Sequence, residues 1–350
     1  MASPTPASAP PVERGAHFVS SDVVRATLAW SACIDAIEAA YRRPGAGADA
    51  VAPARTVASS PNGQWLRTLP AIPGAGQYFG AKFMGGKRAT SSIGPVTEYL
   101  IVLFDRETGH LAGFVDGHLV TAYRTAATTA VGLRRLAARR GVAPLSVGVL
   151  GTGLEAQMHL RAVAAVMPVR DVTMFSPTAE RRGRVVAQLA DELGLPVAGV
   201  NSAAAAVGDA ELVITAARSY DESPILSVGD LSRCHTIGSI GSTVPSQREL
   251  DIDILGASDV IVCDVPDEVT EETGDFLAAI AAGQSFGDRV FGIGALTGDV
   301  LPEAIATSKL ALYKSVGSGV QDVVIAEVAM QAALAAGTAT PLPMLLDTKN

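Results

Sequence analysis

The turn Gly151-Thr152-Gly153-Leu154-Glu155-Ala156 constrains the fold of this 350-residue chain more than any other short segment. It follows the apolar run at 145–150 and precedes a helical pattern that extends to about residue 166. In such a turn the first glycine allows a tight bend, the second lets the backbone approach a pyrophosphate, and the small alanine lets helix and strand pack closely. The N-terminus of the helix also offers free N–H groups to phosphates. The pattern predicts a dinucleotide site at Gly151, Thr152, Gly153, Leu154 and Glu155.

Apolar runs and helical patterns alternate after this turn. Runs at 171–175, 211–216, 235–239 and 259–263 are separated by helical or loop segments, and residues 179–193 have a helical pattern. Alternation of this kind predicts βαβ units and a parallel sheet, and therefore a Rossmann-type fold. We expect the last helical pattern, at 320–336, to be followed by no strand.

The first part of the chain has a different pattern. A helical pattern begins after Ser21-Asp22 and breaks at Pro44-Gly45. Short strand-like segments follow at 64–69, 77–84 and 98–104, and a hairpin-like turn leads to another at 110–115. Residues 120–139 then predict a long, alanine-rich helix that is basic at its C-terminal end, as the helix dipole favours. These features are typical of an α+β region.

The composition excludes several classes of function. Lys+Arg is 27 and Asp+Glu is 35, so the net charge of −8 argues against a nucleic-acid or anionic-membrane surface. No CxxC or HExxH spacing is present, so we expect no metal, and three scattered cysteines cannot form a disulfide framework. We expect a soluble, cytoplasmic protein, because neither a signal peptide nor an apolar run of membrane-spanning length is found.

The segment after the second Rossmann strand bears on the choice of cofactor. NAD enzymes usually carry an acidic residue there, whereas this chain has Ser176-Pro177-Thr178. Arg181, Arg182 and Arg184 follow within two helical turns, and arginines near this position suit a 2′-phosphate. The sequence therefore favours NADP(H), with NAD(H) as the alternative, and predicts cofactor contacts at Ser176, Thr178 and Arg181.

Further segments, in order along the chain, carry a family resemblance. They are GAKF at 80–83, LFD at 103–105, TAYRTAA at 121–127, GTGLEAQMH at 151–159, RELD at 248–251 and KSVG at 314–317. With them the chain resembles the ornithine cyclodeaminase/mu-crystallin family of NAD(P)-dependent proteins over about residues 50 to 325.

The resemblance implies an α/β fold with an inserted domain. A Rossmann NAD(P)-binding domain, residues 129–317, would lie within an α+β substrate-binding and dimerisation domain formed by residues 16–128 plus 318–350. The active site would lie in the cleft between them, and two copies would form a homodimer whose substrate-domain sheets join. Residues 1–15, which are rich in proline, alanine and serine, are expected to form a disordered tail.

The resemblance also implies site residues. Arg55, Lys82 and Arg124 would bind the carboxylate of a small amino or imino acid, for which the planar guanidinium gives a two-point contact. Lys82 and Arg124 would be catalytic, and a lysine among arginines should have a lowered pKa suited to proton transfer. Asp322 would help to close the nicotinamide pocket. Further cofactor contacts would come from Ser239, Lys314, Ser315 and Gly317.

One departure from the family bears on the activity. Cyclodeaminases of the family carry an aspartate two residues before a proline and a lysine two residues after it, and here Thr243 and Gln247 flank Pro245 at those places. The sequence therefore favours an NAD(P)H-dependent reductase of a small imino, ketimine or 2-oxo acid that yields an α-amino acid. An ornithine or lysine cyclodeaminase, an amino-acid dehydrogenase and a non-enzymatic, crystallin-like NADP-binding protein remain alternatives.

Overall fold

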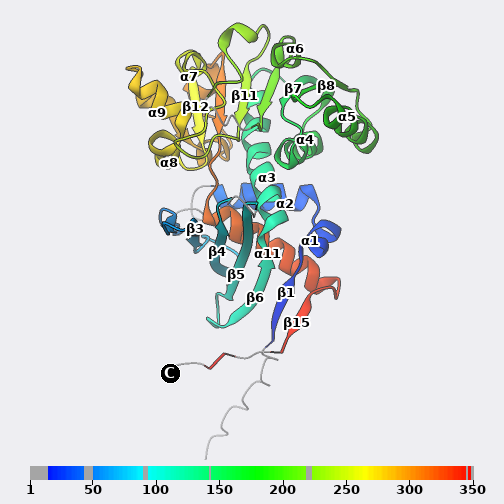
Figure 1. The fold of residues 1–350 in the computed structure, drawn as a ribbon, viewed down its shortest axis with the longest axis vertical. Helices are drawn as coiled ribbons and strands as arrows, with labels where there is room; N and C mark the ends of the chain where they lie inside the picture. The colour runs from blue at the N-terminus through cyan, green and yellow to red at the C-terminus, as the bar shows by residue number, and fades with distance from the viewer. Residues whose placement is uncertain are drawn as a thin grey trace, which may run out of the picture.

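The computed structural model describes residues 15–42, 50–89, 94–141, 143–217, 223–343 and 346–347. These residues form two β-sheets with helices between and around them, as Figure 1 shows. The tail expected at residues 1–15 lies outside the described residues apart from Gly15, and so does the helix break expected at Pro44-Gly45.

The first sheet belongs mainly to the N-terminal part of the chain. Within the described residues it has seven strands in the order β15-β1-β6-β5-β4-β3-β2. Strands β2 to β6 pair antiparallel with one another, whereas β1 is parallel to β6. The strands are β1 (Ala16–Val19), β2 (Thr56–Ser59), β3 (Gln64–Ala71), β4 (Tyr78–Lys87), β5 (Val96–Asp105), β6 (Leu111–Asp116) and β15 (Thr340–Leu342).

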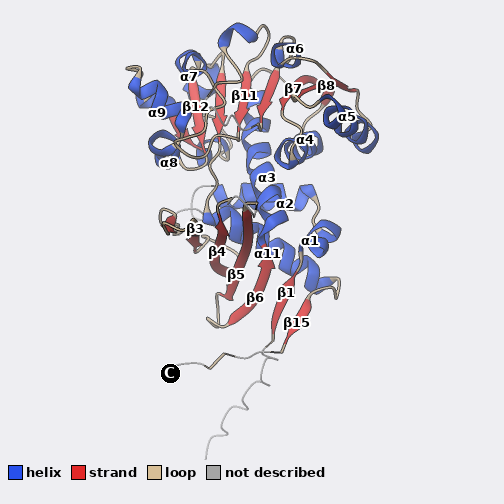
Figure 2. Cartoon of the chain, in the orientation of Figure 1, coloured by secondary structure: helices blue, strands red, loops and turns tan. Residues whose placement is uncertain are grey.

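Helices cover one face of this sheet, as Figure 2 shows. Helix α11 lies across β3, β4 and β5, and it also contacts α2 and α3. These helices supply alanine, valine and isoleucine to a core that the inward side chains of the strands complete. The helices on this side are α1 (Ser21–Thr27), α2 (Trp30–Tyr41), α3 (Gly117–Ala138) and α11 (Gly319–Ala335).

The second sheet is parallel throughout and has eight strands within the described residues, in the order β13-β12-β14-β11-β10-β7-β8-β9. Its central strands are buried on both faces, as expected of a parallel sheet covered by helices. The strands are β7 (Leu145–Leu150), β8 (Val169–Phe175), β9 (Val197–Gly199), β10 (Leu212–Thr215), β11 (Thr236–Ser239), β12 (Val260–Cys263), β13 (Val290–Gly292) and β14 (Ala311–Lys314).

The helices around this sheet connect its strands. Longer helices α4 and α5 follow β7 and β8, and shorter ones follow the later strands. The α/β fold with a Rossmann region is thereby confirmed. The helices are α4 (Leu154–Val166), α5 (Ala179–Leu193), α6 (Ala203–Val207), α7 (Ile252–Ala257), α8 (Pro266–Glu272), α9 (Gly274–Ala281) and α10 (Glu303–Thr307), and the 3₁₀ turns are η1 (Val228–Asp230), η2 (Gly287–Arg289) and η3 (Ile293–Leu296).

Helix α3 joins the two parts of the molecule. It contacts β5 of the first sheet and β11 and β14 of the second, and it is buried along most of its length. Close packing requires small residues here, since a Cβ on Gly132 would lie 2.6 Å from the ring of Tyr313. The domain boundary predicted between residues 128 and 129 falls inside this helix, and the division into domains stays a prediction.

Two expectations about the elements were wrong. A strand does follow the last helix: β15 pairs antiparallel with β1, with Ala16 opposite Leu342. Its sequence, Thr-Pro-Leu, is short and contains a proline, which is tolerated at the edge of a sheet but gives little strand signal. The first helical pattern is divided into α1 and α2, because the backbone is extended at Leu28 and Ala29.

Candidate active site

A cavity of about 210 Å³ opens between the first sheet, helix α3 and the carboxyl ends of the Rossmann strands. It brings together the three residues predicted to bind substrate with two predicted to contact the cofactor, Glu155 and Ser315. The described residues that line it are Arg55, Arg67, Leu69, Lys82, Met84, Tyr99, Thr121, Arg124, Thr125, Glu155, Ala216, Ile240, Gly241, Thr243, Ser315 and Val316.

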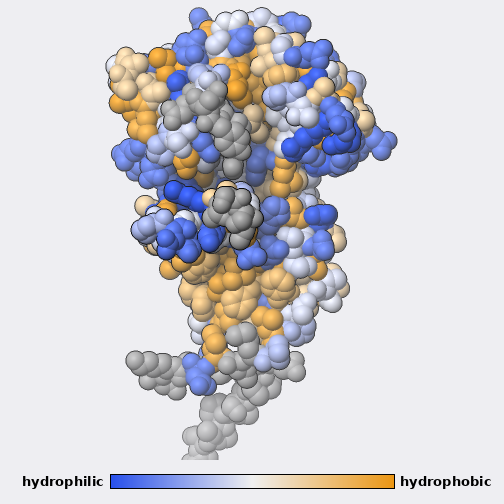
Figure 3. All heavy atoms as spheres, viewed as in Figure 1, coloured by the Kyte–Doolittle hydropathy of each residue, from blue (hydrophilic) through white to orange (hydrophobic). Residues whose placement is uncertain are grey.

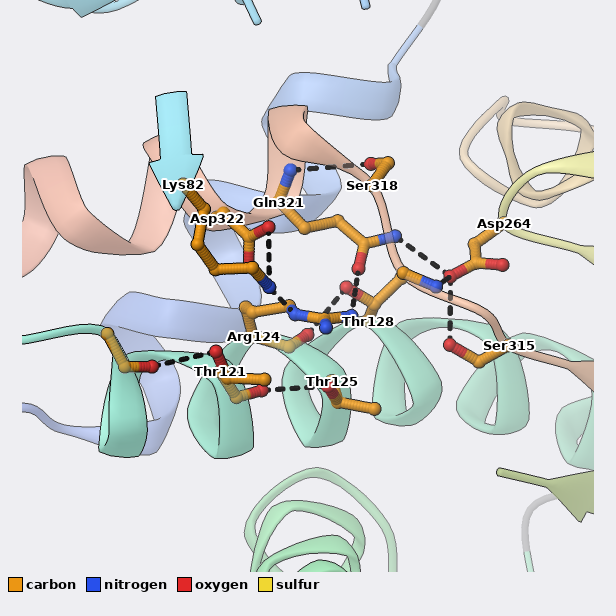
Figure 4. Close-up of polar contacts among 12 residues, drawn as sticks. Lys82, Thr121, Arg124, Thr125, Thr128, Asp264, Ser315, Ser318, Gln321 and Asp322 are labelled. Carbon is orange, nitrogen blue, oxygen red and sulfur yellow. Dashed lines mark hydrogen bonds and ion pairs between the residues drawn. The ribbon is translucent and has the colours of Figure 1, made fainter. Parts of the chain in front are cut away.

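Lys82 and Arg124 share one carboxylate. Lys82 comes from β4 and Arg124 from α3, and Asp322 at the start of α11 lies between them (Figure 4). The Lys82 Nζ is 2.8 Å from both oxygens of Asp322, and the Arg124 Nε is 3.0 Å from Oδ1. Asp322 is fully buried and Lys82 is 1% exposed, so the carboxylate holds both cations at the wall of the cavity.

A second set of contacts holds Arg124 and the loop before α11. Gln321 accepts a hydrogen bond from Arg124 (3.1 Å) and donates one to Asp264 (3.1 Å). Asp264 in turn accepts hydrogen bonds from the hydroxyl of Ser315 and the backbone N–H of Gly317, each at 2.8 Å. Gly317 has φ +84°, and a Cβ there would lie 2.0 Å from the guanidinium of Arg124. A glycine is therefore required where Arg124 approaches the loop.

The surroundings of Lys82 change its acidity. Burial lowers the pKa of Lys82 to about 8, although Asp322 favours the ammonium form; the positive charges of Arg124 and Arg55 lower the pKa further. A lowered pKa agrees with the expectation from the sequence. At neutral pH this lysine remains mostly protonated, but it can give up its proton at little cost.

Arg55 reaches the cavity from the segment before β2, and it is already paired. It forms an ion pair with Glu268 of α8, and it donates to the backbone carbonyl of Gly317 at 3.3 Å. Burial, together with the positive charges of Arg67 and Arg124, lowers the pKa of the Arg55 guanidinium. The role of Arg55 in binding substrate stays a prediction.

The Gly151–Gly153 turn has the features that a dinucleotide requires. Gly151 has φ +121°, and a Cβ there would lie 2.6 Å from the carbonyl oxygen of Ala216. Gly153 is the N-cap of α4, no side chain caps this end, and no atom lies within 4 Å of where its Cβ would be. The N-terminus of α4 is thus uncapped by any side chain and uncrowded at Gly153, and this is the end of the helix at which the pyrophosphate of NAD(P) binds in such turns. The residues present fit a bound dinucleotide.

The residues predicted to contact the ribose side of the cofactor differ in burial. Ser176 is buried and accepts a hydrogen bond from Thr152 at 2.9 Å, while Thr178 and Arg181 are exposed at the start of α5. Arg182 is also buried: it donates to the backbone carbonyl of Ser176 and to Asn201 at 2.7 Å.

The arginines after β8 therefore do not act as one cluster. Arg182 holds the end of β8 in place, and Arg184 pairs with Glu180 at 2.6 Å. The expectation that Arg182 faces the 2′-phosphate thus loses its basis, because its guanidinium is engaged within the protein. Arg184 and Glu180 form an exposed surface pair, so the expectation for Arg184 stays a prediction. Arg181 forms no ion pair within the described part of the chain.

Ser239 and Lys314 lie at the carboxyl ends of β11 and β14. Their side chains belong to a buried hydrogen-bond network. Both are fully buried, and neither lines the cavity. Lys314 donates to Ser239 at 2.9 Å and lies 3.4 Å from Asp275. Ser239 donates to Glu249 at 3.0 Å, and burial raises the pKa of Glu249 above its ordinary value. Their predicted contact with the cofactor stays a prediction.

The position of the missing aspartate does face the cavity. Thr243 lines it, and its backbone N–H contacts the side chain of Gln247 at 3.4 Å. Glu155 is the one acidic residue among the described residues that line the cavity. The place where family cyclodeaminases carry their aspartate is therefore occupied by a neutral hydroxyl.

Sequence reasoning missed Arg67, Asp264 and Gln321. Arg67 sits in the alternating segment that became β3, where a single arginine looks like an ordinary exposed strand residue. Asp264 directly follows β12. A polar residue at the carboxyl end of a Rossmann strand is a candidate site residue, so Asp264 could have been identified from the sequence. Gln321 precedes Asp322, and only the fold shows that it reaches across to Asp264.

The described residues contain no group of three or more His, Cys, Asp or Glu side chains arranged to hold a metal ion. Among them, no helix is long and apolar enough to span a bilayer.

Known proteins resemble the chain over most of its length. The family model of the ornithine cyclodeaminase/mu-crystallin family matches residues 16–337. The iminosuccinate reductase of Paracoccus denitrificans is 28% identical over 239 residues, which cover 68% of this chain and 72% of that protein. The ketimine reductase mu-crystallin of Mus musculus is 26% identical over 323 residues, which cover 90% and 97%.

A solved structure shares the fold. The Delta(1)-pyrroline-2-carboxylate reductase of Thermococcus litoralis, in complex with NADH and L-proline, superposes with a TM-score of 0.81 at 21% identity. The match covers 93% of this chain and 99% of that one. Because the family model spans nearly the whole chain, this protein belongs to the ornithine cyclodeaminase/mu-crystallin family.

Proposed function

We propose that this protein is an NAD(P)H-dependent reductase that converts the C=N bond of a small imino acid into an α-amino acid. The observation that carries the proposal is the buried Lys82–Asp322–Arg124 arrangement at the wall of a cation-rich cavity that also reaches Glu155 of the dinucleotide turn. The relatives named as iminosuccinate, ketimine and pyrroline-2-carboxylate reductases support it.

Arg124 and Lys82 would hold the α-carboxylate of the substrate. Asp322 fixes both groups, and Gln321 fixes the guanidinium from its other side, so their donors are oriented before any ligand arrives. Preorganised charged donors bind a carboxylate without a further ordering cost.

Reduction of a C=N bond needs a hydride on carbon and a proton on nitrogen. A nicotinamide cofactor held at the Gly151–Gly153 turn would supply the hydride. The Lys82 ammonium, with its pKa near 8, supplies the proton, and Asp322 stabilises the ammonium form beforehand. The buried position of Lys82 keeps bulk water away from this proton.

The alternatives have weaker support. A cyclodeaminase of this family needs a carboxylate where Thr243 lines the cavity. A crystallin-like binding protein would have no use for a desolvated lysine whose charge is costly to bury. An amino-acid dehydrogenase would use the same groups in the oxidative direction, with Lys82 as the base.

For the cofactor, NADP(H) is favoured over NAD(H). Ser176 stands where an acidic residue would repel a 2′-phosphate, and the exposed Arg181 offers a positive charge nearby. Arg182 does not contribute to this preference, because its guanidinium is engaged within the protein.

We further propose a homodimer. The face of the first sheet that points away from α11 carries an apolar hollow between β3, β4 and β5, and Figure 3 shows apolar atoms gathered over the lower part of the molecule, where this sheet lies. Ile72, Phe83 and Leu100 are each at least 36% exposed there. Contiguous apolar surface of this kind commonly marks an interface, and a second copy would cover it.

The test is a panel of imino acids, including cyclic imines and the imines formed from 2-oxo acids with ammonia or methylamine. NADPH and NADH are each supplied, and loss of the reduced nicotinamide and formation of the amino acid are measured. We expect stoichiometric consumption with at least one substrate. Release of proline and ammonia from ornithine without net cofactor change would indicate a cyclodeaminase instead. Bound cofactor with neither reaction would indicate a binding protein.

A further inference from the structure

Arg67 faces the cavity from the same side of the first sheet as Lys82. In the sheet register Arg67 lies opposite Met84, and Leu69 lies opposite Lys82. All four line the cavity, so Arg67 and Lys82 occupy adjacent rows of one face. Two residues along a strand separate those rows, which corresponds to about 6.7 Å between backbone positions.

Arg67 differs from the other cations of the cavity in lacking a counterion. Lys82 and Arg124 share Asp322, and Arg55 is paired with Glu268. Arg67 forms no ion pair within the described residues. Its buried Nε has no hydrogen-bond partner there, as is also the case for the Nε atoms of Arg55 and Arg124, so the missing counterion is what sets Arg67 apart. Arg67 is half-buried and lines the cavity, so an anion bound there could pair with its guanidinium.

The positive charges are also close enough to oppose one another. Arg67 is a neighbour whose charge lowers the pKa of Arg55, and Arg124 acts in the same way. An anion placed among these guanidiniums would relieve the repulsion and give Arg67 its missing partner. In the function proposed above the α-carboxylate of the substrate is held by Lys82 and Arg124, so a second anionic group of the substrate would be the partner of Arg67.

We propose that Arg67 binds a second acidic group of the substrate, so that the enzyme acts on imines of short dicarboxylic acids. The row spacing suits a second carboxylate separated from the first by a short chain, as in an acid of about four or five carbons. This proposal rests on the function proposed above and narrows its substrate class. It makes Arg67 the residue that distinguishes an acidic side chain from a neutral one of equal size.

Isosteric pairs of product amino acids test this directly, because binding can be measured without turnover. L-Aspartate is compared with L-asparagine, and L-glutamate with L-glutamine, by titration calorimetry on the protein saturated with NADP⁺ or NAD⁺. In the unmodified protein we expect one acid to bind at least about 10-fold more tightly than its amide, as expected for a charge-assisted contact.

Variants of Arg67 then show whether that residue causes the preference. Arg67→Met should remove the preference by weakening the acid about 10- to 100-fold while the amide changes little, and Arg67→Lys should keep part of it. Arg88→Met is the matched control, because Arg88 is exposed at the end of β4 and does not line the cavity. It should leave the preference unchanged.

Several results would overturn the proposal. The unmodified protein could bind acid and amide equally tightly, or bind neither saturably. In Arg67→Met, the tighter binding of the acid could persist, or the affinity could fall equally for acid and amide. Consumption of NAD(P)H with monocarboxylic imines alone would also contradict it, yet would leave the reductase function intact. If no imine is reduced while the Arg67-dependent preference for the acid is found, the reductase fails and the acidic subsite stands.

Discussion

Among the residues that the structure describes, Lys82 and Lys314 are buried lysines that each lie against a buried aspartate. Lys82 approaches Asp322 at 2.8 Å beside the cavity, and Lys314 approaches Asp275 at 3.4 Å inside the Rossmann region. Both lysines have an aspartate as their direct partner, but the charged and polar groups around the two pairs differ. Arg124 and Arg55 oppose the charge of Lys82, whereas Glu249 and Ser239 surround Lys314.

The difference separates a lysine suited to chemistry from one suited to structure. Lys82 has an opening in front of it and cations around it, so its proton is easily given up. Lys314 neutralises acids that would otherwise repel each other, and it has no access to the cavity. Burial and an ion pair alone therefore do not identify a catalytic lysine; the sign of the surrounding charges and access to ligand do.

The largest effect is expected on turnover. Lys82→Met should reduce kcat with an imino acid by about 10²- to 10⁴-fold, because the proposed proton donor is lost. The variant should lower the free energy of unfolding by less than it raises the activation free energy of turnover, because Asp322 keeps its contact with Arg124. Steady-state kinetics and thermal unfolding of the same preparation check this. Near-normal kcat would remove Lys82 from the mechanism.

Lys314→Met should show the opposite pattern. Removing this ammonium leaves Asp275 and Glu249 buried without their cation, so the free energy of unfolding should fall by about 3–5 kcal/mol. Chemical denaturation measures the loss, and at temperatures where the variant stays folded its kcat should fall far less than that of Lys82→Met. If Lys314→Met instead abolishes turnover at unchanged stability, the contrast between the two lysines is wrong.

The two neighbouring arginines after β8 extend the comparison to the cofactor side. Arg182→Ala should lower the free energy of unfolding by about 1–3 kcal/mol, because two buried hydrogen bonds are lost. Arg181→Ala should leave stability unchanged and weaken NADPH more than NADH. Dissociation constants for both cofactors in both variants provide the measurement, and tighter binding of NADH than NADPH to the unmodified protein would refute the NADP(H) preference.

The smallest effect concerns pH. In the proposed mechanism the ammonium form of Lys82 is the acid in reduction, so kcat/KM should fall as pH rises above about 8, by at most tenfold per unit. In the oxidative direction the neutral amine is needed, and the rate should rise toward the same pH. A pH dependence caused by titration of the substrate would appear equally in Lys82→Met. Only a change of kcat/KM with pH that the variant no longer shows is therefore due to Lys82.

Much of the Rossmann region was predictable from local patterns. The strand β7, the turn at Gly151–Gly153 and the helix α5 are specified by short-range apolar periodicity and glycine placement. The strand β14 (Ala311–Lys314) was missed, although it lies inside the sheet between β12 and β11 and is as long as those strands. Its place depends on neighbours far away in sequence, which no local pattern records.

The site was predictable in its residues but not in its pairings. Lys82 and Arg124 were identified through the resemblance, and both face one cavity. That Asp322 joins them, that Glu268 occupies Arg55 and that Arg67 has no counterion depend on segments up to 240 residues apart. The burial of Arg182 was likewise hidden, because a helical pattern does not show which arginine turns toward Asn201.

The most direct measurement follows the hydride itself. The protein is supplied with a reducible imino acid and with NAD(P)H carrying deuterium at both C4 positions of the nicotinamide, and the amino acid formed is analysed by mass spectrometry and NMR. The proposed function predicts one deuterium on the α-carbon for each cofactor oxidised, with the nitrogen-bound proton coming from solvent through Lys82. An amino acid formed without deuterium at that carbon, or without net oxidation of the cofactor, would contradict it.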